Sequence, residues 1–234
     1  MKKIGVISLI LLTTGVIAGF YYWQQATTLP TWYEKQVTTA NINNTRNRLN
    51  IQQTTEKIEV KIAASTQQLV NNKDIELQLD ENELNNLLAS EIVKKSNKNQ
   101  LVQAVKAVKT EIENGKLKSG AIVNISEIST AQLGKNEVAE LTKVIKAFPT
   151  LEDREVYLGI EGKPIFKNGQ LRFDENSTIK VGNLSFTQAE LSEKLGIPES
   201  KIKQFTKLQL QIDKLKVNDI ELNDEKALLR GSVN

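Results

Sequence analysis

The most constraining feature of the sequence is an uncharged apolar run near the N-terminus, Ile4 to Trp23. A helix rises about 1.5 Å per residue, so a run of this length matches the roughly 30 Å hydrocarbon core of a bilayer. Lys2 and Lys3 precede it, and positive charge before a span favours a cytoplasmic N-terminus. The aromatic residues that close the run are typical of the far membrane interface. The sequence therefore predicts residues 1–23 as a transmembrane signal-anchor.

The alternative interpretation of this run is a cleaved secretory signal, with Val16 and Ala18 as the small residues before the cut. The apolar stretch would then be short for a span, and the bulky residues 20–23 would follow the cut directly. Both interpretations export the remainder of the chain. We expect a single-pass protein of the cell membrane, with a cytoplasmic N-terminus and an extracytoplasmic body.

The composition excludes several chemistries for that body. The chain has no His and no Cys, which rules out zinc-thiolate sites, thiolate nucleophiles and histidine general bases. The formal net charge of +3 includes Lys2 and Lys3, and the other lysines are dispersed among acidic residues. The sequence contains neither a glycine-rich phosphate loop nor calcium-loop spacing. We therefore expect no enzyme activity, no metal site, no cofactor and no nucleic-acid partner.

The strongest remaining catalytic candidate is a Ser-x-x-Lys sequence, Ser177 to Lys180, because penicillin-binding proteins and serine β-lactamases use this spacing. Their mechanism needs the serine at a helix start, so that the lysine one turn later can take its proton. Here Ile179 and Val181 alternate with polar residues, which indicates a strand. Residues three apart on a strand point to opposite faces, so we expect no catalytic pair.

A polar segment, residues 24–53, follows the apolar run; it is rich in Gln, Asn and Thr and contains Pro30. This composition indicates a stalk that holds the body away from the bilayer. From residue 54 the apolar residues become periodic, first with helical spacing and then with strand alternation. Residues 54–234 are therefore predicted as a single extracytoplasmic α+β domain.

Helices are predicted in this domain at about 80–95, 136–148 and 187–195. Asp80 with Glu83, and Thr187 with Glu190, each have the spacing of a capping box at a helix start. The recurrence of strand, cap and helix is consistent with a duplicated unit, or with two unrelated helix starts that use the same common capping motif. Each helix has one apolar stripe, which must pack against another element.

Strand alternation and turn residues predict antiparallel hairpins. Asn114-Gly115 lies between two alternating runs, and Asn-Gly supplies the positive φ angles of a type I′ turn. Asn168-Gly169 marks a second hairpin, and Gly162-Lys163-Pro164 interrupts the strand before it. Asn218-Asp219 and Asn223-Asp224 indicate further turns in the tail. The expected fold is α+β, with a curved antiparallel sheet packed against helices.

Two stretches carry a resemblance to a known family. The sequence LDENELNNLLAS is similar to the LTE-x-ELN-x-LL pattern of small exported bacterial proteins, and the tail from Lys207 to Val233 resembles their paired closing strands. The fold of these proteins is related to the tubular lipid-binding (TULIP-like) superfamily. The resemblance covers residues 54–234 in layout. It implies a helix-grip fold that holds or passes lipids, with no catalytic residues.

The sequence leaves two hypotheses for function. In the first, an anchored, non-catalytic module binds lipid or another apolar envelope molecule in a space between sheet and helices. In the second, the core is solid and the protein is an envelope scaffold or assembly factor that engages protein partners. The first hypothesis assigns the wall of the ligand site to inward-facing aliphatic residues: Leu84, Leu87, Leu88, Ile92, Val123, Ile125, Leu141 and Ile145.

Overall fold

A computed structural model describes residues 22, 24–35, 56–58, 60–61, 74–99, 104–128, 130, 133–151, 153–167, 170–206, 208–209 and 215–233. The chain is α+β, with antiparallel sheets and helices, as the sequence predicts. Within these ranges, no helix has the length and apolar character needed to cross a bilayer. The predicted span at residues 4–23 lies outside the described residues apart from Tyr22.

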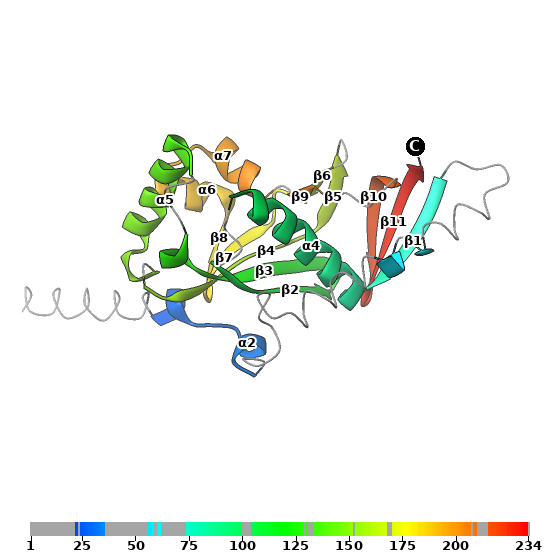
Figure 1. Cartoon of the computed structure of the whole chain (residues 1–234), viewed down its shortest axis with the longest axis horizontal. Helices are drawn as coiled ribbons and strands as arrows, with labels where there is room; N and C mark the ends of the chain where they lie inside the picture. The colour runs from blue at the N-terminus through cyan, green and yellow to red at the C-terminus, as the bar shows by residue number, and fades with distance from the viewer. Residues whose placement is uncertain are drawn as a thin grey trace, which may run out of the picture.

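The strands within the described residues form three antiparallel sheets (Figure 1). A five-stranded sheet has the order β2-β3-β4-β7-β8, and the two smaller sheets have the orders β1-β11-β10 and β5-β6-β9. The sequence predicts one curved sheet, and this prediction is wrong. The chain leaves the five-stranded sheet after Gly162, because its partner strand β3 begins only one residue before Leu117, the ladder partner of Gly162. Strand β5 then starts a new pairing with β6 at Pro164.

The bounds of the strands are β1 Asp74–Asp80, β2 Val105–Glu113, β3 Lys116–Asn124, β4 Glu155–Gly162, β5 Pro164–Lys167, β6 Gln170–Phe173, β7 Thr178–Val181, β8 Leu184–Phe186, β9 Leu208–Gln209, β10 Leu215–Asn223 and β11 Lys226–Val233. The bounds of the helices are α2 Thr31–Lys35, α4 Glu81–Asn99, α5 Lys135–Ala147, α6 Gln188–Leu195 and α7 Glu199–Phe205. Helix α4 runs along one face of the five-stranded sheet, and α5, α6 and α7 gather at the end away from β1, β10 and β11 (Figure 1). Helix α2 lies on the other side of that sheet (Figure 1).

Both predicted capping boxes are confirmed. At the start of α4, the Glu83 N–H donates to Asp80 Oδ1 over 2.8 Å, and the Asp80 N–H donates to Glu83 Oε2 over 3.1 Å. At the start of α6, the Glu190 N–H donates to Thr187 Oγ1 over 3.1 Å, and the Thr187 N–H donates to Glu190 Oε2 over 2.8 Å. Helix α6, which follows the second box, leads into α7, whereas α4 leads into the β2-β3 hairpin. The elements that follow the two boxes therefore differ, which does not favour a duplicated unit.

We expect Thr187→Ala to lower the free energy of unfolding by about 1 kcal/mol, because one N–H at the start of α6 loses its acceptor. The Thr187 N–H and then its hydroxyl hold the pKa of Glu190 below its usual range. The carboxylate therefore stabilises the cap above the ordinary glutamate pKa, and this contribution is lost as pH falls through the lowered pKa of the folded state. Urea denaturation near pH 7 and at about pH 3 measures the effect.

The difference between wild type and Thr187→Ala should be larger near neutral pH than in acid. The matched control is Thr142→Ala, since the Thr142 hydroxyl donates to the Val138 carbonyl inside α5 and caps no helix start. It should leave stability unchanged or slightly raised, because Ala is the better helix former. An equal loss for Thr187→Ala at both pH values would contradict the coupling of the Glu190 carboxylate to the cap.

Two of the predicted turns are confirmed, one is wrong, and one lies outside the described residues. Asn114 (φ 53°) and Gly115 (φ 68°) connect β2 and β3, and Asp224 (φ 49°) lies in the turn between β10 and β11. The turn predicted at Asn218-Asp219 is wrong, because these residues lie inside β10, where the register shifts as in a β-bulge. Strands β5 and β6 pair as a hairpin, although Asn168-Gly169 itself lies outside the described residues.

The buried side chains in the described part of the chain form two hydrophobic clusters. The first joins β1, α4, β10 and β11 to the turn end of the β2-β3 hairpin and to β6. The second lies between the other end of the five-stranded sheet and α5, α6 and α7. Periodicity alone predicts that these faces are buried, but it does not separate one cluster from the other.

Candidate functional site

A cavity of about 400 Å³ lies within the second cluster, between the five-stranded sheet and helices α5 to α7. Strands β3, β4 and β7 contribute one wall, and the three helices with the 3₁₀ turn Pro149–Leu151 contribute the other. The residues that line the cavity include Ala121, Phe148, Leu158, Ile179, Leu191 and Ile202. The lining is almost wholly apolar, so the cavity can enclose a hydrocarbon group and offers few polar contacts.

The pairing of β3, β4 and β7 explains why their apolar side chains meet at this wall. Leu158 of β4 is the ladder partner of Ala121 on β3 and of Val181 on β7. Directly paired residues of antiparallel strands share a face, so these side chains lie side by side beneath the helices. Tyr157 and Glu161 alternate with Leu158 along β4 and therefore face the opposite side of the sheet.

Helix α7 is a part of the site that the sequence pattern does not predict. It contributes Ile202, which is 1% exposed and lines the cavity. The signal for its start is present in the sequence, because Pro198 comes directly before the helix and Glu199 occupies its first turn. The segment is short, Glu199–Phe205, and gives too few turns for a clear apolar period.

The structure divides the predicted wall residues between the two clusters. Leu84, Leu87 and Leu88 of α4 are buried in the first cluster, whereas Ile125 is buried in the second and Leu141 and Ile145 pack against it. Val123 on β3 is half-buried, and the side chain of Ile92 lies outside the described residues. None of those whose side chains are described lines the cavity. The ligand contact assigned to them from the sequence stays a prediction, and the structure brings a different set of residues to the cavity.

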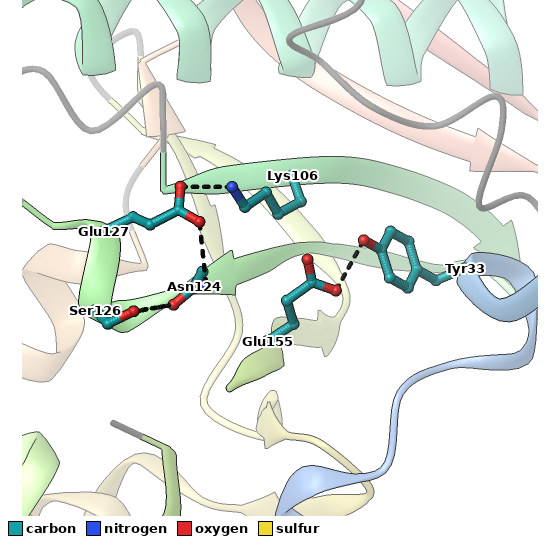
Figure 2. A network of polar contacts seen from close by, with 6 residues as sticks. All are labelled: Tyr33, Lys106, Asn124, Ser126, Glu127 and Glu155. Carbon is teal, nitrogen blue, oxygen red and sulfur yellow. Dashed lines mark hydrogen bonds and ion pairs between the residues drawn. The ribbon is translucent and has the colours of Figure 1, made fainter. Parts of the chain in front are cut away.

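The first part of the predicted stalk lies against the body. Ala26 is 2% exposed and belongs to the second cluster, and the Asn183 N–H donates to the Gln25 carbonyl over 2.8 Å. The Tyr33 hydroxyl donates to Glu155 Oε2 over 2.9 Å (Figure 2). Burial, with a further contribution from this carboxylate, raises the pKa of Tyr33 to about 12, so the hydroxyl stays a donor at neutral pH. Residues 24–35 are therefore packed, and 36–55 lie outside the described residues.

A network of polar contacts holds the end of β3, close to the hydrogen bond between Tyr33 and Glu155 (Figure 2). Lys106 forms an ion pair with Glu127, and the Asn124 amide donates to the same carboxylate over 3.1 Å. The Ser126 N–H and hydroxyl both donate to Asn124 Oδ1, over 3.1 and 2.7 Å. These contacts satisfy the start of the 3₁₀ turn that follows β3 and hold the chain where it enters the second cluster.

A lysine connects the end of the apolar N-terminal run with the cavity. Lys194 Nζ of α6 lies 4.7 Å from the ring centroid of Tyr22 and 5.2 Å from that of Phe148. Both distances are within the range of a cation–π contact. Phe148 lines the cavity, so the end of the predicted anchor lies one side chain away from it.

The polar side chains near the cavity are engaged in structural contacts. Ser177 Oγ accepts from the Gln188 amide over 3.2 Å, while Lys180 Nζ donates to Ser185 Oγ over 2.7 Å, so the Ser-x-x-Lys pair has separate partners. The Ser119 hydroxyl pairs with that of Thr110 at 2.9 Å. Over the part of the chain that the structure describes, no group of acidic side chains is arranged to hold a metal ion. What this site offers is enclosure of an apolar group.

No protein-family model matches the chain, and neither does any curated protein or solved structure. The TULIP-like resemblance therefore stays a prediction from the sequence.

Proposed function

We propose that the protein is a membrane-anchored, extracytoplasmic, non-catalytic protein that binds the hydrocarbon chain of a lipid or another apolar envelope molecule. The apolar cavity of about 400 Å³ between the five-stranded sheet and α5 to α7 carries this proposal. Its volume falls within the range of about 300–1,000 Å³ that ligand pockets occupy. A TULIP-like arrangement, in which a sheet and helices enclose a lipid chain, is consistent with this position of the cavity.

Burial of the chain supplies the binding energy in this proposal. Each methylene removed from water contributes about 0.8 kcal/mol, so roughly ten methylenes contribute about 8 kcal/mol before the cost of ordering the ligand. Such a ligand needs no directional partner, which agrees with a lining of Leu, Ile, Val and Phe side chains. The protein would therefore discriminate by length and width of the apolar chain more than by its polar end.

The contacts of Tyr22 support exchange with the membrane in which the chain is anchored. In this proposal residues 4–23 span the bilayer, and the aromatic residues at their end lie at the interface. Lys194 contacts the rings of both Tyr22 and Phe148, so with this span the cavity helices would lie next to the headgroup layer. A basic side chain at this point also suits the phosphate of a lipid headgroup.

Native mass spectrometry of the full chain tests the proposal. The full chain is required because residues 24–35 pack on the body. We expect the protein released from detergent micelles to carry co-purified lipid, and to exchange it for a fluorescent fatty acid. Purification in two detergents of different mass separates bound detergent from lipid. A lipid-free mass together with no uptake of fatty acid or phospholipid would contradict lipid binding and favour the scaffold hypothesis.

A further inference from the structure

A second pocket, of about 280 Å³, lies on the opposite face of the five-stranded sheet from the apolar cavity. Strands β2, β3, β4 and β7 form its base, and the docked segment 24–35 contributes Pro30 and Trp32. Its lining is mixed: aromatic rings and charged side chains predominate, and Ile160 and Lys180 also border the apolar cavity. The sheet therefore separates an apolar site from a polar one.

The aromatic walls of this pocket are held in place by the backbone. The Tyr157 ring lies over the paired glycines Gly120 and Gly159, where a Cβ atom would approach it to 2.4 and 2.5 Å. Trp32 meets the Tyr157 ring edge-on, with the centroids 6.3 Å apart and an interplanar angle of 80°. Because the planes of the two rings are nearly perpendicular, the rings form two adjoining walls, and either wall can take the flat, non-polar face of a ligand.

The charged side chains alternate in sign across the strands. Glu111 on β2 pairs in register with Lys118 on β3, which pairs with Glu161 on β4, and Lys180 follows on β7. These four groups carry no net charge together, so the pocket gives no general preference for an anion or a cation. A neutral ligand with both donors and acceptors matches this alternation.

Two polar groups of the pocket have no hydrogen bond in the described part of the chain. The Glu161 carboxylate has Lys180 Nζ at 3.7 Å and Lys116 Nζ at 3.9 Å, both longer than a hydrogen bond. The Tyr157 hydroxyl is the second such group, and burial, followed by the charges of Glu111 and Glu161, raises its pKa to about 12. Beside the aromatic rings the pocket thus offers one acceptor, the ion-paired Glu161 carboxylate, and one donor, the Tyr157 hydroxyl, for hydrogen bonds to a ligand.

We propose that this second pocket binds a neutral saccharide. A pyranose ring has C–H groups on its face, which can stack on Tyr157 or on Trp32, and hydroxyl groups around its rim. Each hydroxyl can donate to Glu161 and accept from Tyr157 or a lysine. A lipid chain is disfavoured because it would remove these charged groups from water and offer them no hydrogen bond in return. The proposal is independent of lipid binding, since the two sites lie on opposite faces of the sheet.

Saturation-transfer NMR with the full chain in phospholipid nanodiscs tests the proposal, since sugar-based detergents would compete. The probes are chitotriose, cellotriose and maltotriose at about 10 mM, above the millimolar Kd of a weak site. We expect saturation transfer to at least one of them. Glu161→Gln should weaken it about tenfold, and Tyr157→Phe, which keeps the ring over the glycines, should weaken it several-fold.

Glu76→Gln is the matched control. Glu76 lies on β1 and pairs with Arg230, and neither residue lines the pocket, so the same loss of charge should leave binding unchanged. Hydrogen exchange at the Asn183 N–H, which donates to the Gln25 carbonyl, reports whether each variant keeps the docked segment in place. Tyr157→Phe remains informative if Glu161→Gln does not fold. Absence of transfer to every probe, or transfer that neither pocket variant weakens, would overturn the proposal.

Discussion

Ala121→Phe is expected to reduce the affinity of the protein for a fluorescent fatty acid at least tenfold, about 1.4 kcal/mol or more. Ala121 lies on β3 and lines the apolar cavity beside its ladder partner Leu158. A phenyl ring at this position would occupy space that the proposal assigns to the hydrocarbon chain. The loss comes from exclusion of methylenes from the cavity, each of which contributes about 0.8 kcal/mol when buried.

Stability of the same variant distinguishes the two functional hypotheses. If the cavity is free to receive a ligand, the added ring fits, and the free energy of unfolding changes little or rises. If the sheet and helices close on a solid core, overpacking should cost about 1–3 kcal/mol. Urea denaturation of the full chain measures this difference, and a loss in that range would favour a scaffold over a lipid-binding module.

Ala139→Phe is the matched control for Ala121→Phe. Ala139 is exposed on α5 and does not line the cavity, so the same side chain is added without filling it. Fatty-acid uptake should then equal that of the wild type. Unchanged uptake in Ala121→Phe itself would show that the ligand does not occupy this cavity.

Gly182→Ala is expected to lower the free energy of unfolding by about 3 kcal/mol and to release the docked segment 24–35. Gly182 lies between β7 and β8 with φ +58°, and a Cβ atom there would lie 2.4 Å from the Ala26 carbonyl oxygen. The left-handed conformation alone costs a non-glycine residue about 1–2 kcal/mol. The remainder comes from a clash between backbone groups, which no side-chain rotation can relieve.

Gly196→Ala measures the cost of the left-handed conformation without the cost of the backbone clash. Gly196 has nearly the same φ, +59°, at the end of α6, and its Cβ would meet nothing within 4 Å. We expect it to cost about 1 kcal/mol. Urea denaturation compares the two variants, and hydrogen exchange at the Asn183 N–H, which donates to the Gln25 carbonyl, reports release of the segment. Equal costs and unchanged protection would contradict docking of residues 24–35.

The features predicted correctly from the sequence depend on neighbouring residues. The capping boxes at Asp80 and Thr187 need only a partner three positions away, and the turn at Asn114-Gly115 needs only the positive φ that these residues tolerate. The turn prediction failed at Asn218-Asp219, where the same residue types lie in a β-bulge. Local propensity allows both outcomes there, and pairing with β11 decides between them.

The parts of the site that were not predicted depend on contacts between distant residues. The periodic spacing of apolar residues predicts that both Leu84 and Ile125 are buried, but the two residues lie in separate clusters. The polar composition of residues 24–35 indicates a solvated stalk, yet Tyr33 reaches Glu155 and Trp32 packs against Tyr157. A few apolar side chains are enough to dock a polar segment when the body offers a matching surface.

The sequence by itself determined an α+β chain with an apolar N-terminal run, no histidine or cysteine chemistry, and helices and hairpins at defined positions. Only the tertiary structure decided how the strands divide into three sheets, where the apolar cavity lies and which polar groups surround Tyr157. The physical reason is the distance along the chain over which the deciding interactions act. Caps and turns are set by hydrogen bonds within a few residues, whereas a cavity is what remains when elements far apart in the chain pack together and their side chains do not fill the space between them.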